Sequence, residues 1–380
     1  MSLRTLTIST AAALTLAGAS FAAQGVTSDG VKFAQVAAME GPAGALGLGM
    51  QQGIRAAFEE ANRAGGVNGR MLTLDSVDDG YEPDRSVTEV QTIIAGDGHL
   101  GLIGAVGTPT SAATQPIATA GNMPFIGPFT GAGFLRDGNL KNILNVRATY
   151  AAETEEWIKH LVDNEGFTKV AILYQDDGFG RVGLDGVTEA LARRGMTLAA
   201  TGTYTRNTVA VKSALLEIRK AEPEAVVMVG AYKPIAEFIK LSRKLKFNPE
   251  FVNISFVGSK ALAQELGPDG EGVIISQVVP FPWDASVPVV AAYQAALSAV
   301  DPAAEPGFVS LEGYLVGRLA IEALTRTGAN VSREQFLTAM ADLGTVDFGG
   351  AEMSFGPGDN QGMDSVFLTR IKADGTFEPL

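Results

Sequence analysis

Three glycines follow the first apolar run of the chain at a spacing close to that of a nucleotide-binding turn. Gly47-x-Gly49-x-x-x-Gly53 comes after an expected strand and opens an expected helix, and Asp75 ends the next strand. In a dinucleotide fingerprint only two residues separate the second and third glycines. The longer spacing here favours a tight turn with close backbone packing over a dinucleotide site.

Histidine and cysteine offer little catalytic or metal-binding chemistry. The only histidines are His99 and His160, and neither has a serine nucleophile elbow or metal-ligand spacing nearby. The chain has no cysteine, which excludes disulfides, thiolate chemistry and cysteine-ligated zinc. We therefore expect both histidines at the surface.

Paired acids occur beside glycine at Asp78-Asp79-Gly80 and at Asp176-Asp177-Gly178. Such pairs can perform acid–base catalysis or bind calcium, but neither belongs to a complete calcium loop, and acidic turns are far commoner. Asp359 and Asn360 lie in GPGDNQG, a composition typical of a hairpin turn. No constellation accounts for catalysis, so the sequence predicts a protein that is not an enzyme and needs no cofactor or metal.

The pattern of apolar residues alternates between strands and helices, and it does so in two series. The expected strands are 31–39, 71–77, 100–106 and 124–126, and then 169–174, 197–204, 225–230, 251–257 and 272–279. Nearly continuous apolar strands between helices are typical of parallel sheets covered on both faces. The chain is therefore predicted to be α/β, with two doubly wound parallel-sheet lobes and a ligand cleft between them.

The remaining segments follow the second series. Two helices at 288–300 and 310–327, with no strand between them, are predicted to return to the first lobe. Runs 353–355 and 365–371 flank the turn GPGDNQG and predict a closing hairpin.

Hydroxyl side chains and free backbone N–H groups occur where expected strands lead into helices. Ser111 opens a helix after the loop GTPTSAATQP, and Phe129 and Thr130 follow the next strand. Ligands of open α/β sheets bind at such strand ends, and helix starts suit an anion. One hydroxyl alone could be a helix cap. Two converging loops favour a binding site for a carboxylate.

The N-terminus has the pattern of a secretory signal peptide. Arg4 precedes the apolar stretch 6–19, and Ser20 and Ala22 take the small-residue positions before a cleavage site at Ala22/Ala23. We expect residues 1–22 to be removed on export to a periplasm. Loss of Arg4 leaves 28 basic against 42 acidic side chains, a net charge of −14. So acidic a chain is predicted not to bind nucleic acid.

From residue 31 to its end, the chain resembles the type I periplasmic binding proteins that include the leucine/isoleucine/valine receptors. The order and spacing of several short motifs carry this resemblance. They are GPAGALG near 41, ANRAGGVNGR at 61–70, DDGYEPDRS at 78–86, TQPIA at 114–118, GPFTGA at 127–132, YQDDGFGR at 174–181 and GAYKP at 230–234.

The resemblance implies two lobes joined by three crossovers, here near 145–148, 279–281 and 344–348. The implied first lobe is 23–146 plus 281–344, and the second is 147–280 plus 345–380. Bound ligand would close the lobes like a hinge.

The resemblance also assigns positions that contact the ligand. Ser111 and Thr130, with the backbone of Phe129, would hold the ligand carboxylate. Tyr232 matches a cleft tyrosine and Phe308 an aromatic that packs on the ligand side chain. The chain departs from the branched-chain receptors at two further cleft positions, which are Phe179 and Leu46 in place of tyrosines.

The acid that pairs with the ligand ammonium in the family is absent, because Ser255 occupies its place in NISFVG. A buried ammonium without a partner is costly. Either another acid substitutes, with Glu312 as the candidate, or the ligand has no ammonium. Glu312 could equally be an exposed helix carboxylate.

Together these features predict a solute receptor whose partners are a small-molecule ligand and the membrane permease of an ABC importer. The ligand would be an amino acid, or an aromatic or aliphatic carboxylate. The alternative from another class is a sensory protein that reports the ligand to a membrane kinase or chemoreceptor.

Overall fold

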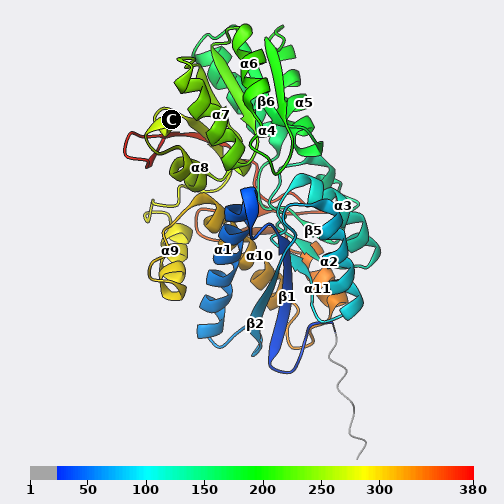
Figure 1. Ribbon diagram of the computed structural model, residues 1–380. Coiled ribbons are helices and arrows are strands. Elements are labelled where there is room, and N and C mark those ends of the chain that lie inside the picture. Colours follow the sequence, from blue (N-terminus) through cyan, green and yellow to red (C-terminus); the bar gives the residue numbers. More distant parts are fainter. Residues whose placement is uncertain (1–23) are drawn as a thin grey trace, which may run out of the picture.

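The computed structural model describes residues 24–380 and arranges them as two lobes, each built on its own sheet (Figure 1). The predicted signal peptide and its cleavage site at Ala22/Ala23 lie outside the described residues. No helix among residues 24–380 is both long and apolar enough to cross a membrane.

The first lobe contains a five-stranded parallel sheet in the order β2-β1-β3-β4-β5. Its strands are β1 (Gly30–Ala37), β2 (Met71–Asp78), β3 (Leu102–Ile103), β4 (Phe125–Ile126) and β5 (Ile143–Leu144). Its helices are α1 (Gly44–Arg63), α2 (Pro83–Gly96), α3 (Thr108–Ala120), α9 (Pro288–Val300), α10 (Phe308–Arg326) and α11 (Arg333–Ala341). Helices α9 and α10 pack on α1, which confirms that the chain returns to this lobe.

The second lobe contains a seven-stranded sheet in the order β14-β13-β10-β9-β8-β6-β7, parallel except for β13 and β14. Its strands are β6 (Val170–Gln175), β7 (Ala200–Tyr204), β8 (Ala225–Val229), β9 (Glu250–Asn253), β10 (Ile274–Gln277), β13 (Phe367–Ile371) and β14 (Phe377–Pro379). Its helices are α4 (Tyr150–Ile158), α5 (Gly178–Ala192), α6 (Lys212–Lys220), α7 (Tyr232–Lys244) and α8 (Ser259–Leu266). The predicted α/β fold class is confirmed.

The predicted closing hairpin is wrong. Strand β12 (Glu352–Ser354) pairs with β11 (Thr345–Asp347) in a separate two-stranded sheet, whereas β13 pairs with β10 and β14. The turn residues between them do form a local bridge, from Gly356 to Asp359. Turn composition indicates that the chain reverses, but it does not determine which strands pair afterwards.

The first crossover runs beside a segment near the C-terminus. Asn145 N–H donates to the carbonyl of Asn360 (2.9 Å), and Met363 N–H donates to the carbonyl of Val146 (2.9 Å). Before that, the ring of Phe348 lies 5.3 Å from the guanidinium carbon of Arg318 on α10. The predicted lobe boundaries at 146/147, 280/281 and 344/345 stay predictions, and these contacts favour a third crossing at 360–363.

The acidic pairs serve local structure. Asp177 caps α5 by accepting hydrogen bonds from the N–H groups of Phe179 (2.9 Å) and Gly180 (3.4 Å). Asp79 accepts from Tyr81 N–H (2.8 Å) and from the hydroxyl of Ser86 (2.7 Å). These are the acidic turns that the sequence favoured.

The spaced glycines let α1 approach its neighbours closely. A Cβ on Gly47 would lie 1.9 Å from the carbonyl oxygen of Ala38. A Cβ on Gly53 would lie 1.9 Å from the carbonyl oxygen of Ser310 and 2.5 Å from the nitrogen of Tyr314, both on α10. Backbone atoms cannot yield locally, so the glycine spacing reflects helix packing, as the sequence indicated.

We predict that Gly53→Ala lowers the free energy of unfolding by about 1–3 kcal/mol, the usual cost of overpacking a core. The matched control is Gly96→Ala in α2, where a Cβ meets no atom within 4 Å. This control should be neutral or stabilising by up to about 1 kcal/mol. Urea denaturation measures both variants, and equal midpoints would contradict the account of α1–α10 packing.

Candidate functional site

Four aromatic rings interleave where the lobes meet, and Phe256 lies at their centre. Phe256 follows β9 in the second lobe, and its ring centroid is 4.6 Å from that of Phe179 on α5. From the first lobe, Phe129 lies 5.4 Å and Tyr81 6.0 Å from the same ring. All four rings are buried. The structure therefore holds the lobes in a closed arrangement.

A buried ion pair lies beside these rings. Arg147 donates to both oxygens of Glu312, with Nε–Oε1 and Nη2–Oε2 distances of 2.8 Å each. The guanidinium carbon lies 4.0 Å from the centroid of the Phe129 ring. Burial alone would lower the pKa of Arg147, but the charge and hydrogen bonds of Glu312 outweigh it and raise that pKa.

The candidate ammonium partner is thus not an exposed helix carboxylate. Glu312 is 2% exposed and lines a small pocket with Phe308 and Ser255. Both of its oxygens already accept from Arg147. Its role toward a ligand ammonium stays a prediction, and a ligand would have to share the carboxylate with Arg147.

A second buried acid reaches the position that lacks the family's acid. Glu153, on α4, accepts hydrogen bonds from the N–H group and the hydroxyl of Ser255 (2.9 Å each) and from the hydroxyl of Ser276. Burial raises the pKa of Glu153. The sequence analysis missed this residue, because an acid in the first turn of a helix ordinarily signals only a favourable dipole interaction.

The two loops predicted to bind the carboxylate do meet, but within the described residues the hydroxyl of Thr130 is hydrogen-bonded and that of Ser111 is not. The hydroxyls of Thr130 and Thr108 bond to each other (2.6 Å), and Thr130 also accepts from Ala132 N–H (3.2 Å). The hydroxyl of Ser111 is buried and has no hydrogen-bond partner among the described residues. Thr130 is therefore engaged inside the first lobe, while Ser111 remains available to a ligand.

The predicted Leu46 and Tyr232 lie at lobe-to-lobe contacts. The Tyr232 hydroxyl, on α7, accepts from the N–H of Ala45 on α1 (3.3 Å). The side chain of Leu46 packs on Gly258, where an added Cβ would lie 2.6 Å from Leu46 Cδ2. Both residues therefore contribute to closure.

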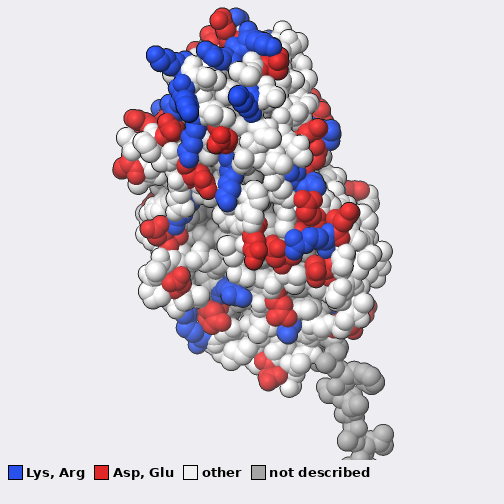
Figure 2. All heavy atoms as spheres, viewed as in Figure 1, with Lys and Arg blue, Asp and Glu red and all other residues white. Residues whose placement is uncertain are grey.

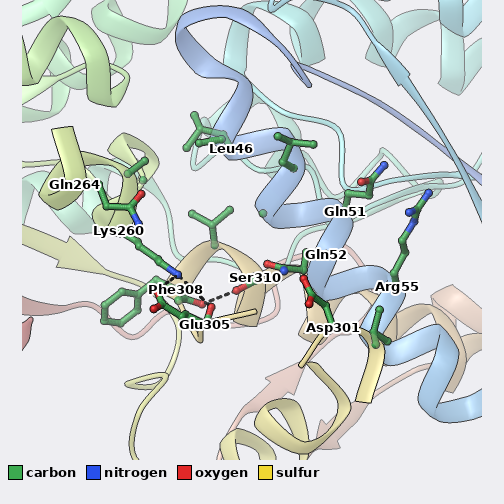
Figure 3. A pocket seen from close by; sticks show the side chains of 18 residues that line it. Leu46, Gln51, Gln52, Arg55, Lys260, Gln264, Asp301, Glu305, Phe308 and Ser310 are labelled. Atoms are coloured by element: carbon green, nitrogen blue, oxygen red, sulfur yellow. Dashed lines mark hydrogen bonds and ion pairs between the residues drawn. The ribbon is translucent and has the colours of Figure 1, made fainter. Parts of the chain in front are cut away.

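Phe308 belongs to a second aromatic group, and it also lines the small pocket shared with Phe129 and Glu312. Its ring centroid is 5.6 Å from that of Trp283, 5.9 Å from that of Phe281 and 6.1 Å from that of Phe377. Phe308 and Leu46 also line an open pocket of about 510 Å³. Figure 3 shows this pocket between α1, which carries Gln51 and Gln52, and α8, which carries Lys260 and Gln264. Ser111, Thr130 and Phe179 do not line it.

Comparison with known proteins assigns the family. The sequence profile of the Periplasmic binding protein family matches residues 30–376. The chain belongs to this family. Its members are extracytoplasmic, non-enzymatic binding proteins, which confirms the prediction that the chain is not an enzyme.

Individual relatives extend this finding. A crystal structure described as a possible leucine/isoleucine/valine-binding protein from Rhodopirellula baltica is 36% identical, with a TM-score of 0.88 over 93% of this chain and 96% of that one. Leu/Ile/Val-binding protein homolog 3 of Brucella melitensis is 26% identical over 210 residues, 55% of this chain and 56% of the relative. The first curated relatives are matched over only 56 to 61% of their length.

A more distant structure shares the fold alone. A branched-chain amino acid ABC transporter structure from Thermus thermophilus with bound valine is 16% identical, with a TM-score of 0.82 over 93% of this chain and 95% of that one.

Polar contacts at the rim hold the lobes of this periplasmic binding protein together. Arg206, which follows β7, pairs with Glu82 of the first lobe (Nη2–Oε2 2.8 Å), and Asn207 donates to the carbonyl of Gly80 (2.9 Å). Elsewhere on the rim, Lys260 on α8 pairs with Glu305 of the first lobe (2.7 Å). These contacts exist only while the lobes are closed.

We predict that Glu82→Gln shifts the free protein toward the open state. Because both partners are partly exposed, loss of the pair should cost about 0.2–1 kcal/mol of closure free energy. Asp176→Asn is the control, since it removes an exposed pair with Arg181 (2.8 Å) inside the second lobe. Small-angle scattering should show a larger radius of gyration for Glu82→Gln only. Equal radii in the two variants would show that the Glu82 pair does not hold the lobes.

Proposed function

We propose that this periplasmic binding protein is the exported solute receptor of an ABC importer, working in a periplasm after removal of residues 1–22. It captures a small carboxylate-bearing solute, an amino acid or a close relative, when its two lobes close. The observation that carries the proposal is the closed interface, in which Phe129 packs on Phe256 of the second lobe, the buried Arg147 guanidinium lies over Phe129, and the buried hydroxyl of Ser111 has no partner among the described residues. Such a site suits an apolar solute with an anionic group.

The relatives support the same chemistry. Leucine, isoleucine and valine occur in the names of the relatives, and valine is bound in the Thermus thermophilus structure. Each of these amino acids has an α-carboxylate next to an apolar side chain. The partner would be the membrane permease of the importer.

Surface charge supports a small solute over nucleic acid. Figure 2 shows that Lys and Arg on the pictured face gather on the end of the second lobe farthest from the first, over α6 and α7. The waist between the lobes has no continuous basic track on that face. A protein that follows a phosphate backbone needs such a track.

Two alternatives rest on specific features. Ser255 carries no acid, and the neighbouring Glu153 is already bonded to Ser255 and Ser276, which favours a ligand without an amine, namely an aromatic or aliphatic carboxylate. A sensory protein for a membrane kinase or chemoreceptor would use the same cleft, and loss of solute uptake in cells that lack this chain would favour transport over sensing.

The ligand class is tested by calorimetry with matched probes. The probes are L-leucine and L-phenylalanine, the corresponding acids without the amine (4-methylpentanoate and 3-phenylpropanoate), and the primary amides of all four. We expect the tightest carboxylate to lose about 1.5–3 kcal/mol of binding free energy as its amide, the range for hydrogen bonds to a charged group. Equal affinity of acid and amide would overturn the proposed carboxylate specificity.

Closure itself has a natural reporter. Trp283 stacks on Phe377 of the second lobe (centroids 5.4 Å, planes 14° apart) and meets Phe308 of the first lobe edge-on (5.6 Å). Trp157 is fully buried on α4 inside the second lobe. Motion between the lobes therefore changes the surroundings of Trp283 and not those of Trp157.

We predict a ligand-dependent change in tryptophan fluorescence that survives Trp157→Phe and disappears in Trp283→Phe. Titration with the tightest probe of the calorimetric panel measures it, and small-angle scattering should show a smaller radius of gyration on binding. Saturation with no change in either signal would replace hinge closure by a rigid pocket.

A further inference from the structure

We propose that Arg147 and Tyr150, on the first crossover and at the start of α4, bind the ligand carboxylate together with Ser111. This inference rests on the proposed function, because it identifies the groups that recognise the solute. It replaces Thr130, whose hydroxyl is already bonded to Thr108, as the second hydroxyl of the site.

Three of the buried side chains that have a polar atom without a partner among the described residues lie around one loop of the first lobe. Ser111, Arg147 and Tyr150 are at most 1% exposed, and each has a polar atom without a hydrogen-bond partner among residues 24–380. These atoms are Ser111 Oγ, Arg147 Nη1 and Tyr150 Oη. A buried polar group without a partner costs free energy, and native proteins rarely tolerate several together. A missing acceptor explains all three.

All three lie around one segment of the first lobe, Phe129–Gly131. The Arg147 guanidinium lies over the Phe129 ring at 4.0 Å. Tyr150 N–H donates to the carbonyl of Gly131 (2.8 Å), and the Tyr150 hydroxyl approaches Thr130 without reaching hydrogen-bond geometry. Ser111 is one helical turn beyond Thr108, whose hydroxyl bonds to Thr130. The three unpartnered groups therefore surround the same loop.

The chemistry of the groups selects an anion. A guanidinium nitrogen has only N–H donors, and both hydroxyls can donate. A carboxylate offers about four lone-pair sites, enough for all three groups. The charged side chains near these three groups also favour an anion over a cation.

Two guanidinium groups lie near the single acid Glu312, and of the two Arg147 is buried and Arg136 partly buried. Arg136 donates only to neutral acceptors, including the carbonyls of Thr130 (2.9 Å) and Ala132 (2.9 Å), and burial followed by repulsion from Arg147 lowers its pKa to about 10. Glu312 compensates Arg147. Glu153 is fully occupied by Ser255 and Ser276, and burial raises its pKa, which weakens its hold on a negative charge. A ligand anion would complete the balance.

The test separates ligand binding from folding, because two of the groups are hydroxyls without a well-formed hydrogen bond in the described part of the closed structure. Tyr150→Phe and Ser111→Ala remove those hydroxyls alone. Each should leave the melting temperature unchanged or raise it, while weakening the tightest carboxylate of the calorimetric panel about tenfold to a hundredfold. Affinity for the amide of the same probe should change far less, since the amide carries no charge to recognise.

The control is Tyr314→Phe on α10. The Tyr314 hydroxyl donates to Glu60 (2.7 Å) and accepts from Arg318 (2.8 Å), within the first lobe. Its loss should lower the melting temperature and leave the affinity for the carboxylate unchanged. The guanidinium is tested by the paired change Arg147→Met with Glu312→Gln, which removes both charges of the ion pair together and should abolish the preference for carboxylate over amide.

The outcomes distinguish failure of the proposed anchor from failure of the proposed function. Wild-type affinity for the carboxylate in Tyr150→Phe and in the paired variant would overturn the anchor and leave the proposed function intact. Equal losses for carboxylate and amide in Tyr150→Phe would show a steric role and also overturn it. Failure of the wild-type protein to bind any carboxylate of the panel would overturn the proposed function and this inference together.

Discussion

The ion pair between Arg147 and Glu312 is the interaction on which the closed structure depends. Arg147 belongs to the first crossover and Glu312 to α10, so the pair fixes the connection between the lobes to the helix that packs on α1. Both side chains are buried, and removing one partner of such a pair typically costs about 3–5 kcal/mol. The pair also holds the guanidinium over Phe129. The ion pair therefore fixes the Arg147 guanidinium, and with it the position of the Phe129 ring between the lobes.

Much of the fold could be predicted from the periodicity of apolar residues alone. Continuous apolar runs such as 169–174 become strands buried on both faces, and α9 forms over the expected range of 288–300. What failed was strand pairing near the C-terminus, because a strand run shows that a segment is extended but not which edge it joins. Strand β13 pairs with β10, which lies about 90 residues earlier in the chain. No local sequence pattern indicates a pairing over that separation.

The site was only partly predictable, and the reason differs between residues. Ser111 was singled out as a candidate because a hydroxyl at a helix start after a strand is a local signal. Arg147, Tyr150 and Glu153 were missed because the stretch NVRATYAAE has the composition of an ordinary strand-to-helix link. Charged residues in such links are usually exposed. Their burial arises only when the two lobes and the 360–363 segment enclose the crossover, which is a tertiary property.

Two free-energy terms oppose each other when the lobes close without ligand. Interleaving four rings removes apolar surface from water and favours the closed state. The same step leaves three buried polar atoms without partners, at about 1–3 kcal/mol each. On the proposed anchor, a carboxylate relieves that cost only when the rings of the second lobe exclude water. A shift from 1% to 99% closed requires about 5.5 kcal/mol of differential affinity. Satisfying three buried donors supplies free energy of this order, so the groups that recognise the ligand are also sufficient to drive the lobes together.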